Sequence, residues 1–296
     1  MPAPAHFQVI HLVDASPYIF RAHFSLPGSI KTPAGAPAAA TYGFASFLLK
    51  LVAAERPTHL AMCFDRNLNG SFRNDEYPDY KAQRDAPPPE LVAQIDPCLE
   101  VAAALGAATF IDERYEADDL IATLLARLTP HGHGGVVVTS DKDLAQLVTD
   151  RVSLLDFAQE TRYTPAMIQE KFGVRPDQIT DLLALAGDPV DNIPGVPGIG
   201  RKTAAEILAA YGHLEDLYAR LDEIPLSKLR AAKSTAGKLR EHRDLAFLSK
   251  RLATVATDAP IPPGVGLDEL TYRGADKAAV EPLFERLGFK RMKERI

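Results

Sequence analysis

The chain has 296 residues, of which 46% are hydrophobic and 24% charged, with two cysteines and a net charge of −6. This length fits one large or two ordinary domains, and the composition excludes a disordered chain. Cys63 and Cys98 cannot form a disulfide framework or a four-ligand zinc site. Because no apolar run of 18 residues occurs and no secretory signal begins the chain, we expect a cytoplasmic protein without a membrane span.

Apolar runs of strand length recur in the first half of the chain, each bounded by turn or polar residues. They cover residues 7–13 (FQVIHLV), 59–64 (HLAMCF), 107–111 (AATFI) and 135–138 (GVVV), with a candidate fifth strand at residues 152–155. Between them, the apolar periodicity predicts helices at residues 41–54, 90–105, 118–128 and 140–148. Alternating strands and helices predict an α/β fold: a parallel sheet with flanking helices.

The pattern becomes helical after about residue 160, and no convincing strand follows residue 155. Helices are predicted at residues 165–172, 178–185, 202–211, 214–221 and 240–250. We therefore predict an α/β domain over residues 1–175 and a helical domain over residues 176–296. The irregular segment 66–89 is long for a loop within a compact domain, and such loops are usually functional or disordered.

Acidic side chains follow the predicted strands at the points where the strands end. Asp14 ends the first strand, Asp65 follows the second, and Asp141 and Asp143 follow the fourth. Because the carboxyl ends of parallel strands meet at one edge of a sheet, we expect these side chains to lie together. Two further acidic groups occur along the chain. The first contains Glu116, Asp118 and Asp119, and the second contains Asp188 and Asp191.

Each of these carboxylates, taken singly, is typical of a helix N-cap or a turn, and Asp118 could cap its helix. As a set they would repel one another and raise one another's pKa values unless a cation compensates. Mg²⁺ and Mn²⁺ prefer oxygen ligands, and no histidine stands near these motifs at the spacing that zinc requires. An all-carboxylate site for two such ions predicts phosphodiester hydrolysis.

Taken alone, the net negative charge argues against a nucleic-acid partner. Nine of the acidic residues, however, belong to the predicted metal site, where cations would neutralise them. Without them, 30 acidic residues stand against 33 basic ones, which leaves a charge of +3. Residues 66–84 interleave cations with aromatic rings, as loops that contact phosphates and stack on bases do: Arg66, Arg73, Lys81 and Arg84 with Phe72, Tyr77 and Tyr80. The alternative is a solvated loop, and the basic stretch 230–251 is equally compatible with a DNA-facing helix or a solvated face.

Residues 193–208 (IPGVPGIGRKTAAEIL) nearly match a phosphate-binding P-loop, but Arg201 separates the second glycine from Lys202 and no strand precedes the segment. Two short helices joined by a hairpin at residues 198–200 fit better. The small residues of such a hairpin let a phosphate approach the backbone N–H groups at the start of the second helix. This predicts a sequence-independent grip on a nucleic-acid backbone, the alternative being an ordinary helical corner with glycine caps.

Five motifs stand in order along the chain. They are FQVIHLVDASPYIFR (7–21), YKAQR (80–84), YEADDL (115–120), TSDKDLAQL (139–147) and GDPVDNIPGVPGIGRKTA (187–204). Together they resemble the 5′→3′ exonuclease and flap endonuclease family, in the bacterial form fused to the N-terminus of DNA polymerase I. The resemblance covers nearly the whole chain. It implies a PIN-like α/β domain and a helical part with a helix-hairpin-helix at about residues 182–211.

The resemblance also implies an enzyme: a hydrolase that cuts 5′ flaps, overhangs and nicked ends of DNA, removes RNA primers in replication and repair, and leaves 5′ phosphates by a two-metal-ion mechanism. The family's Mg²⁺ or Mn²⁺ positions correspond to Asp14, Asp65, Glu116, Asp118, Asp119, Asp141, Asp143, Asp188 and Asp191. Its catalytic positions correspond to Lys81, Arg84, Asp119 and Asp141. Its DNA contacts correspond to Arg21, Arg73, Tyr80, Lys81, Arg84, Gly198, Gly200, Arg201, Lys202 and Thr203, with K⁺ bound at the hairpin.

One position departs from the family pattern: Ala15 follows the first aspartate where the family usually has glycine, and its methyl group could crowd the backbone near the metal site. Two other interpretations stay open. The first is a ribonuclease or toxin of the wider PIN group, which is usually shorter and needs no glycine hairpin. The second is a structure-specific DNA-binding protein with weak or no catalysis, against which the nine retained carboxylates argue. We expect a nucleoid-associated monomer, either a stand-alone paralogue or an excised domain.

Overall fold

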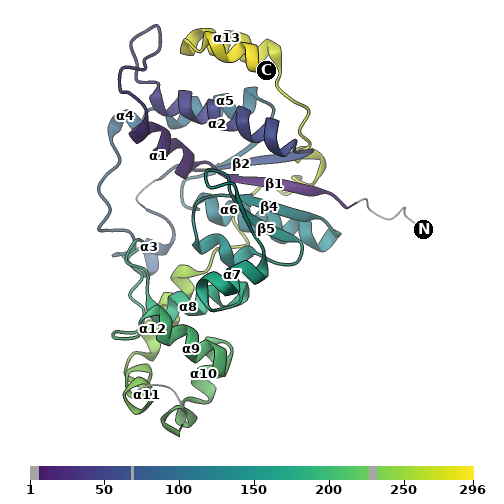
Figure 1. Cartoon of the computed structure of the whole chain (residues 1–296). Helices are drawn as coiled ribbons and strands as arrows, with labels where there is room; N and C mark the ends of the chain where they lie inside the picture. Colours follow the sequence, from purple (N-terminus) through teal and green to yellow (C-terminus); the bar gives the residue numbers. More distant parts are fainter. Residues whose placement is uncertain (1–6, 68–69, 227–231) are drawn as a thin grey trace, which may run out of the picture.

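The computed structural model describes residues 7–67, 70–226 and 232–296. Its centre is a six-stranded sheet with the strand order β3-β2-β1-β4-β5-β6, shown in Figure 1. The strands that run parallel are β1 (Val9–Asp14), β2 (His59–Asp65), β3 (Ala108–Asp112), β4 (Gly134–Val138) and β5 (Val152–Asp156). This confirms the predicted parallel α/β sheet and its candidate fifth strand.

A sixth strand, β6 (Thr161–Tyr163), pairs antiparallel with β5, so the expectation of no strand after residue 155 was wrong. Only three residues long and joined to β5 by a short turn, β6 is too short to show a period-two pattern. Alternate side chains of each central strand point to opposite faces: Leu12 packs in one hydrophobic cluster and Val13 in the other. Both faces are therefore covered, as a parallel sheet requires.

One face of the sheet is covered by α1 (Ser16–Ser25), α2 (Ala39–Glu55) and α5 (Ile95–Ala104), and the other by α6 (Ala117–Leu128). The helix predicted over residues 90–105 is two helices, α4 (Pro89–Val92) and α5. They separate at Gln94, whose side chain accepts a hydrogen bond from the Thr41 N–H (3.2 Å). The helix expected at residues 140–148 is the 3₁₀ turn η2 (Asp143–Leu147).

Below the sheet in Figure 1 lies a helical part. It contains α7 (Pro165–Phe172), α8 (Ile179–Ala186), α9 (Arg201–Tyr211), α10 (Leu214–Ala219), α11 (Ala232–Glu241) and α12 (Arg243–Ala253). The helix predicted at residues 240–250 corresponds mainly to α12, but its predicted start was wrong, because α11 and α12 are separated at His242. The remaining short elements are α3 (Arg73–Glu76), η1 (Thr129–His131), η3 (Pro176–Gln178), η4 (Leu221–Leu226), η5 (Asp268–Leu270) and η6 (Lys290–Arg295).

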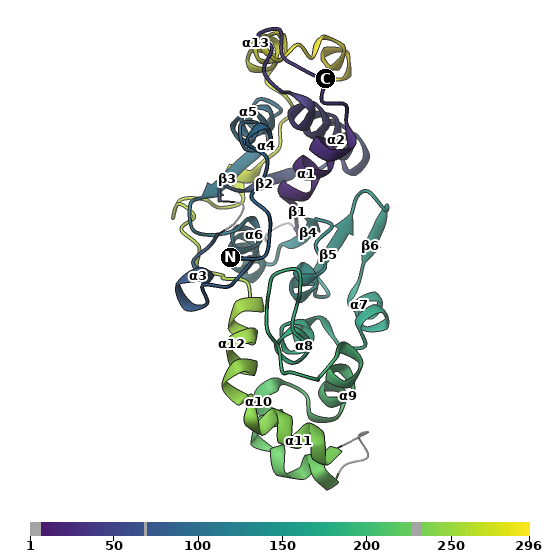
Figure 2. The ribbon, with the colours of Figure 1, turned by 90° about the vertical axis from the view of Figure 1, so that its left-hand side faces the viewer.

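The last helix, α13 (Lys277–Leu287), returns to the α/β part and packs against α5, as Figure 2 shows. Between α12 and α13 the chain runs along the α/β part, where the Tyr272 N–H donates to the Thr58 carbonyl (2.8 Å). Phe284 joins the hydrophobic cluster that α2 and α5 form against the sheet. The predicted domain boundary at residue 175 assigns α13 to the helical domain, whereas its packing partners belong to the α/β layers; the boundary itself stays a prediction.

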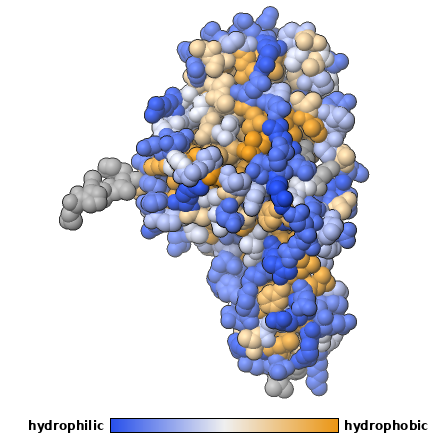
Figure 3. Space-filling view, turned by 180° about the vertical axis from the view of Figure 1, so that it is seen from behind, coloured by the Kyte–Doolittle hydropathy of each residue, from blue (hydrophilic) through white to orange (hydrophobic). Residues whose placement is uncertain are grey.

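The surface carries no continuous apolar belt on the face seen in Figure 3. That face is mainly hydrophilic, with separate apolar patches over the α/β part and the helical part. Within the described ranges, no helix combines the length and apolar character that crossing a bilayer requires.

Candidate nuclease site

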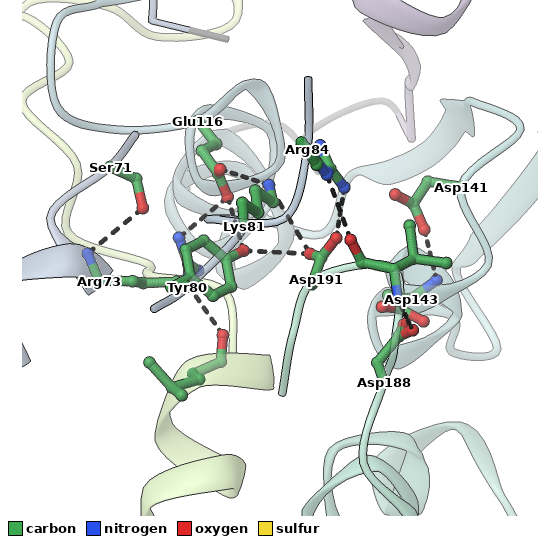
Figure 4. Close-up of polar contacts among 12 residues, drawn as sticks. Ser71, Arg73, Tyr80, Lys81, Arg84, Glu116, Asp141, Asp143, Asp188 and Asp191 are labelled. Atoms are coloured by element: carbon green, nitrogen blue, oxygen red, sulfur yellow. Dashed lines mark hydrogen bonds and ion pairs between the residues drawn. The ribbon is translucent and has the colours of Figure 1, made fainter. Parts of the chain in front are cut away.

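Carboxylates gather at the edge of the sheet where β1, β2 and β4 end. Figure 4 shows part of this group beside the loop of residues 70–84. A cleft of about 210 Å³ lies at this edge. Its charged lining side chains are Asp14, Asp65, Glu116, Asp118 and Asp141, together with the basic residues Lys81 and Arg84. The structure therefore brings together the strand-end carboxylates that the sequence placed at one edge.

Asp14 and Asp65 are held in fixed directions by neutral donors. Asp14 accepts hydrogen bonds from the Thr139 hydroxyl (2.8 Å) and the Ser16 N–H (3.3 Å). Asp65 accepts one from the Ser16 hydroxyl and one from the Ala117 N–H (2.7 Å). Burial, followed by the charge of Asp65, raises the pKa of Asp14 well above its usual range. These carboxylates are thus oriented and electrostatically crowded, the condition that a bound cation relieves.

The start of α6 is capped by Glu116 rather than by Asp118. Glu116 and Asp119 form a reciprocal capping box in which the Glu116 N–H donates to Asp119 (3.1 Å). The possibility that Asp118 caps this helix was therefore wrong. Asp118 instead lies in the cleft, where burial and then the charge of Asp14 raise its pKa well above the usual value.

The basic side of the cleft comes from the loop of residues 70–84. Lys81 forms an ion pair with Glu116, and Arg84 forms one with Asp191. Tyr80 donates to either Glu116 (3.2 Å) or Asp191 (3.1 Å), as Figure 4 shows. Burial acts to raise the pKa of Glu116, but the charges of Lys81 and Arg73 and the hydrogen bonds from Lys81 and Tyr80 together outweigh it, so the pKa is lowered. With only 3% of its surface exposed, the Tyr80 ring is not placed to stack on a base.

A second acidic group lies beside the first. The Asp143 N–H donates to Asp141 (2.8 Å), and the turn after α8 brings Asp188 next to Asp143. Burial, followed by the charges of Asp141 and Asp188, raises the pKa of Asp143 to about 8. A mutual backbone pair between Asp188 and Ile193 (2.8 and 2.9 Å) holds this turn in shape. The acidic residues from the helical part therefore extend the site at the sheet edge.

Arg73 and Asp119 do not face the cleft. Arg73 is 4% exposed and Asp119 is fully buried, and both Asp119 oxygens accept from the Arg73 guanidinium (2.8 and 2.9 Å). The Asp119 oxygens also accept from the N–H groups of Glu116 (3.1 Å) and Ala256 (2.7 Å). This geometry does not fit the predicted DNA contact at Arg73, or the predicted metal-binding and catalytic roles of Asp119.

Arg21 and the other predicted cations differ in how far they are paired. Arg21 is exposed on α1 and lines a small hollow of about 90 Å³ together with Asp141, Lys142 and Lys171. Arg66 is paired with Asp96 (2.6 Å). The first two residues of the basic stretch 230–251 lie outside the described ranges. Three of its cations form ion pairs within the chain: Arg240 with Asp222, Lys250 with Asp181, and Arg251 with Glu76. These pairs favour a structural role for much of that stretch.

The glycine hairpin joins α8 to α9 and presents its tip to solvent. Gly195 has a positive φ (+64°), which glycine adopts readily. A side chain would not fit here, because a Cβ would lie 2.2 Å from the Gly187 nitrogen. Gly198 and Gly200 are exposed, and Gly200 stands directly before α9 with open space in front of it. Sequence reasoning missed Lys238, whose ammonium donates to the Gly198 carbonyl (2.9 Å).

The remaining predicted hairpin contacts lie at the start of α9. Arg201 and Lys202 are exposed there, and Thr203 is half-buried. The first turn of a helix has unpaired backbone N–H groups, so these side chains surround a natural anion site.

Ala15 does not crowd the site. Its φ of −77° and ψ of −32° are ordinary helical values that any residue adopts. Its side chain is fully buried in the hydrophobic cluster, and its N–H donates to the Cys63 carbonyl (2.9 Å). The expected clash beside the first aspartate was therefore wrong.

The site fits hard divalent cations by its chemistry. All of its acidic donors are carboxylate oxygens, which suit Mg²⁺ or Mn²⁺. Among the residues that the structure describes, no three potential ligand side chains already converge on one point. Lys81 and Arg84 instead pair with Glu116 and Asp191, so the chain's own cations balance part of the acidic charge.

Carboxylates lie together at the ends of parallel strands, beside a basic loop. This arrangement is typical of proteins that act on phosphodiesters. Residues 9–173 match the family model of the 5′-3′ exonuclease N-terminal resolvase-like domain. Residues 174–278 match that of the 5′-3′ exonuclease C-terminal SAM fold. The chain belongs to the 5′-3′ exonuclease family, which confirms the resemblance and the α/β-plus-helical fold that it implied.

Relatives at the sequence level are DNA polymerases. DNA polymerase I of Bacillus caldotenax is 40% identical over 290 residues, which cover 96% of this chain and 32% of the relative. DNA polymerase I of Pseudomonas aeruginosa is 40% identical over 280 residues, 94% of this chain and 30% of the relative. The chain thus spans about a third of the length of the curated relatives it matches.

Solved structures share the fold at lower identity. T5 5′-exonuclease with bound divalent zinc ions matches with a TM-score of 0.68 and 22% identity, covering 98% of this chain and 100% of that one. The catalytic core of Rad2 in complex with DNA substrate matches with a TM-score of 0.61 and 18% identity, covering 98% of this chain and 91% of the other.

Proposed function

We propose that the chain is a divalent-metal-dependent, structure-specific 5′ nuclease. It acts on DNA as a 5′→3′ exonuclease and a 5′-flap endonuclease, and it leaves 5′ phosphates. The observation that carries this proposal is the cleft in which Asp14, Asp65 and Asp118 face Lys81 and Arg84. Acidic groups there suit cations and basic groups suit a phosphate, so the cleft is complementary to a phosphodiester with its counter-ions.

The carboxylates would hold two Mg²⁺ or Mn²⁺ ions, one group being Asp14, Asp65, Glu116, Asp118 and Asp141, and the other Asp143, Asp188 and Asp191. When bound, such ions supply Lewis-acid stabilisation of the reacting phosphate. Lys81 and Arg84 exchange their carboxylate partners for phosphate oxygens when DNA enters. Their charges then offset the negative charge that develops in the transition state.

The exposed hairpin glycines and the start of α9 hold the duplex through its phosphates, with Arg201 and Lys202 adding charge. Backbone contacts of this kind do not read bases, so specificity is for junction shape. The substrates proposed are 5′ flaps, overhangs and nicks, with RNA primers as a further class. We propose a monomer that acts at the nucleoid in DNA replication and repair.

The direct test is cleavage of a 5′-labelled flap duplex with Mg²⁺, with EDTA, and by Asp141→Ala with Mg²⁺. We expect cleavage near the junction, lost with EDTA and reduced at least ~100-fold in the variant, because Asp141 lies in the cleft. Asp150→Ala, which removes an exposed aspartate outside the cleft, is the matched control and should cleave normally.

Other outcomes of this assay identify the alternatives. Flap binding without cleavage by the unmodified chain would contradict the proposal and favour a junction-binding protein. Cleavage of single-stranded RNA with no activity on flap DNA would favour a ribonuclease of the PIN group.

We further propose a monovalent-cation site at the hairpin, shared between K⁺ and the chain's own Lys238. The Lys238 ammonium donates to the Gly198 carbonyl, one of the oxygens that K⁺ would use. Duplex affinity of the unmodified chain should therefore change less than about twofold when K⁺ replaces Na⁺ at constant ionic strength. Lys238→Met should bind about fivefold more weakly in Na⁺ and regain affinity in K⁺, as expected from loss of one charged hydrogen bond.

Fluorescence anisotropy with a labelled duplex measures both effects. Lys233→Met, which removes an exposed lysine from the same helix, is the control for loss of charge alone. An identical response to K⁺ in the unmodified chain and the Lys238 variant would refute the role of Lys238.

A further inference from the structure

Arg73 makes more polar contacts than a surface arginine in a DNA-binding loop would. It is 4% exposed, and it contacts Asp119 twice (2.8 and 2.9 Å) and Glu116 once (3.2 Å). The same guanidinium donates to the carbonyls of Leu252 (2.9 Å) and Thr254 (3.0 Å). Arg73 therefore joins the start of α6, which carries site carboxylates, to the end of α12 in the helical part.

The contacts around Arg73 hold the end of α12 from a second side. The Ala256 N–H donates to Asp119 (2.7 Å), and the side chain of Gln146 donates to the Ala253 carbonyl (3.0 Å). Gln146 also accepts from the Val255 N–H (3.1 Å). The segment after α12 is thus bonded both to α6, whose first turn carries site carboxylates, and to η2, which begins at Asp143.

The C-terminal half of α12 also contacts the glycine hairpin. The buried hydroxyl of Ser249 accepts a hydrogen bond from the Gly195 N–H (3.0 Å), and α12 packs against α8, the helix that leads into the hairpin. A continuous series of buried contacts therefore runs from Gly195 through Ser249 and α12 to Arg73, and from Arg73 to Glu116.

We propose that Arg73 is a positioning residue that fixes the distance between the hairpin and the carboxylates, and thereby selects which phosphodiester is cut. This inference rests on the proposed function, since it needs a duplex held at the hairpin and a phosphate at the cleft. The DNA-binding hairpin and the reaction centre lie on separate parts of the fold. They must be rigidly connected if the same phosphodiester is to reach the carboxylates each time. Arg73 acts through Glu116 and α12 and does not touch the DNA.

The test uses Arg73→Lys and Arg73→Gln in the full chain, with Arg114→Gln as the control for loss of an exposed arginine near the same loop. Product lengths from a 5′-flap duplex should spread, with the fraction cut at neighbouring phosphodiesters rising about fivefold in both Arg73 variants. Affinity for the same flap in EDTA should stay within about twofold of the unmodified chain. The Ala256 amide should exchange with solvent faster in the metal-free variants, because its acceptor Asp119 loses its anchor.

A second variant tests the other end of the connection. Ser249→Ala removes the hydroxyl that holds Gly195 and leaves Arg73 intact, so it should spread the product lengths in the same way. It also carries the test if the Arg73 variants do not fold.

The outcomes separate this inference from the function on which it rests. Weaker flap binding with an unchanged cleavage position would make Arg73 a DNA contact and overturn the inference. Unchanged product lengths in the Arg73 variants, or in Ser249→Ala if those do not fold, would also overturn it. Failure of the unmodified chain to cleave would refute the proposed nuclease, while unchanged amide exchange at Ala256 would refute the anchoring role of Arg73 independently.

Discussion

Asp118→Asn is expected to abolish cleavage and to make the metal-free protein more stable. Asp118 lies in the cleft, and burial followed by the charge of Asp14 raises its pKa well above the usual value. Its charge is therefore unfavourable for folding and is retained for function. We expect the cleavage rate to fall at least ~10³-fold and the free energy of unfolding in EDTA to rise by about 1–2 kcal/mol.

Single-turnover cleavage and thermal unfolding in EDTA measure the two effects on one preparation. Asp150→Asn, at an exposed position outside the cleft, should change neither. A variant that loses activity and also loses stability would mean that Asp118 supports the fold, which would contradict this account of the site.

The stability of the metal-free protein is expected to fall as the pH rises from about 4 to about 8. The pKa of Asp143 is raised from its ordinary value of 3.8 to about 8 by burial and by the charges of Asp141 and Asp188. In this window the folded chain binds more protons than the unfolded chain, so each such group lowers stability by up to about 1.4 kcal/mol per pH unit. Asp14 and Asp118 shift in the same direction.

The effect of Glu116 on stability has the opposite sign. Because its pKa is lowered from 4.5, this effect lies at the acidic end of the pH window. Thermal unfolding between pH 5 and pH 8.5 should give a falling midpoint in EDTA and a nearly level one in saturating Mg²⁺. The cation removes the repulsion and displaces the protons. Calorimetry in two buffers of different ionisation enthalpy should detect proton release on Mg²⁺ binding at pH 7. A midpoint in EDTA that is independent of pH would contradict the predicted crowding of carboxylates.

The edge of the sheet was predictable because its rule is local. A buried apolar run followed by an aspartate places Asp14, Asp65 and Asp141 at the carboxyl end of a strand, and parallel pairing then brings the ends together. The hairpin was predictable for a similar reason, since glycine adopts the positive φ of Gly195 and Gly198 more readily than other residues do.

The surroundings of Arg73 and Asp119 were not predictable from local patterns. The carbonyl partners of Arg73 belong to Leu252 and Thr254, which are distant in sequence and carry no signal of the contact in their side chains. The motif that marks Arg73 is compatible with a surface arginine, and only tertiary packing turns it inward. Arg73 faces protein carbonyls and carboxylates for this reason, although its spacing within a basic loop suggested phosphates.

The return of α13 to α5 also determines when the chain can complete its fold during synthesis. Phe284 belongs to the core that α2 and α5 build against the sheet, yet it leaves the ribosome after the whole helical part has been made. The helical part is thus an insertion within the α/β layers, attached to them at both ends. A nascent chain that has reached α12 still exposes the apolar surface of α5, so folding of the N-terminal layers becomes final only after α13 has been synthesised.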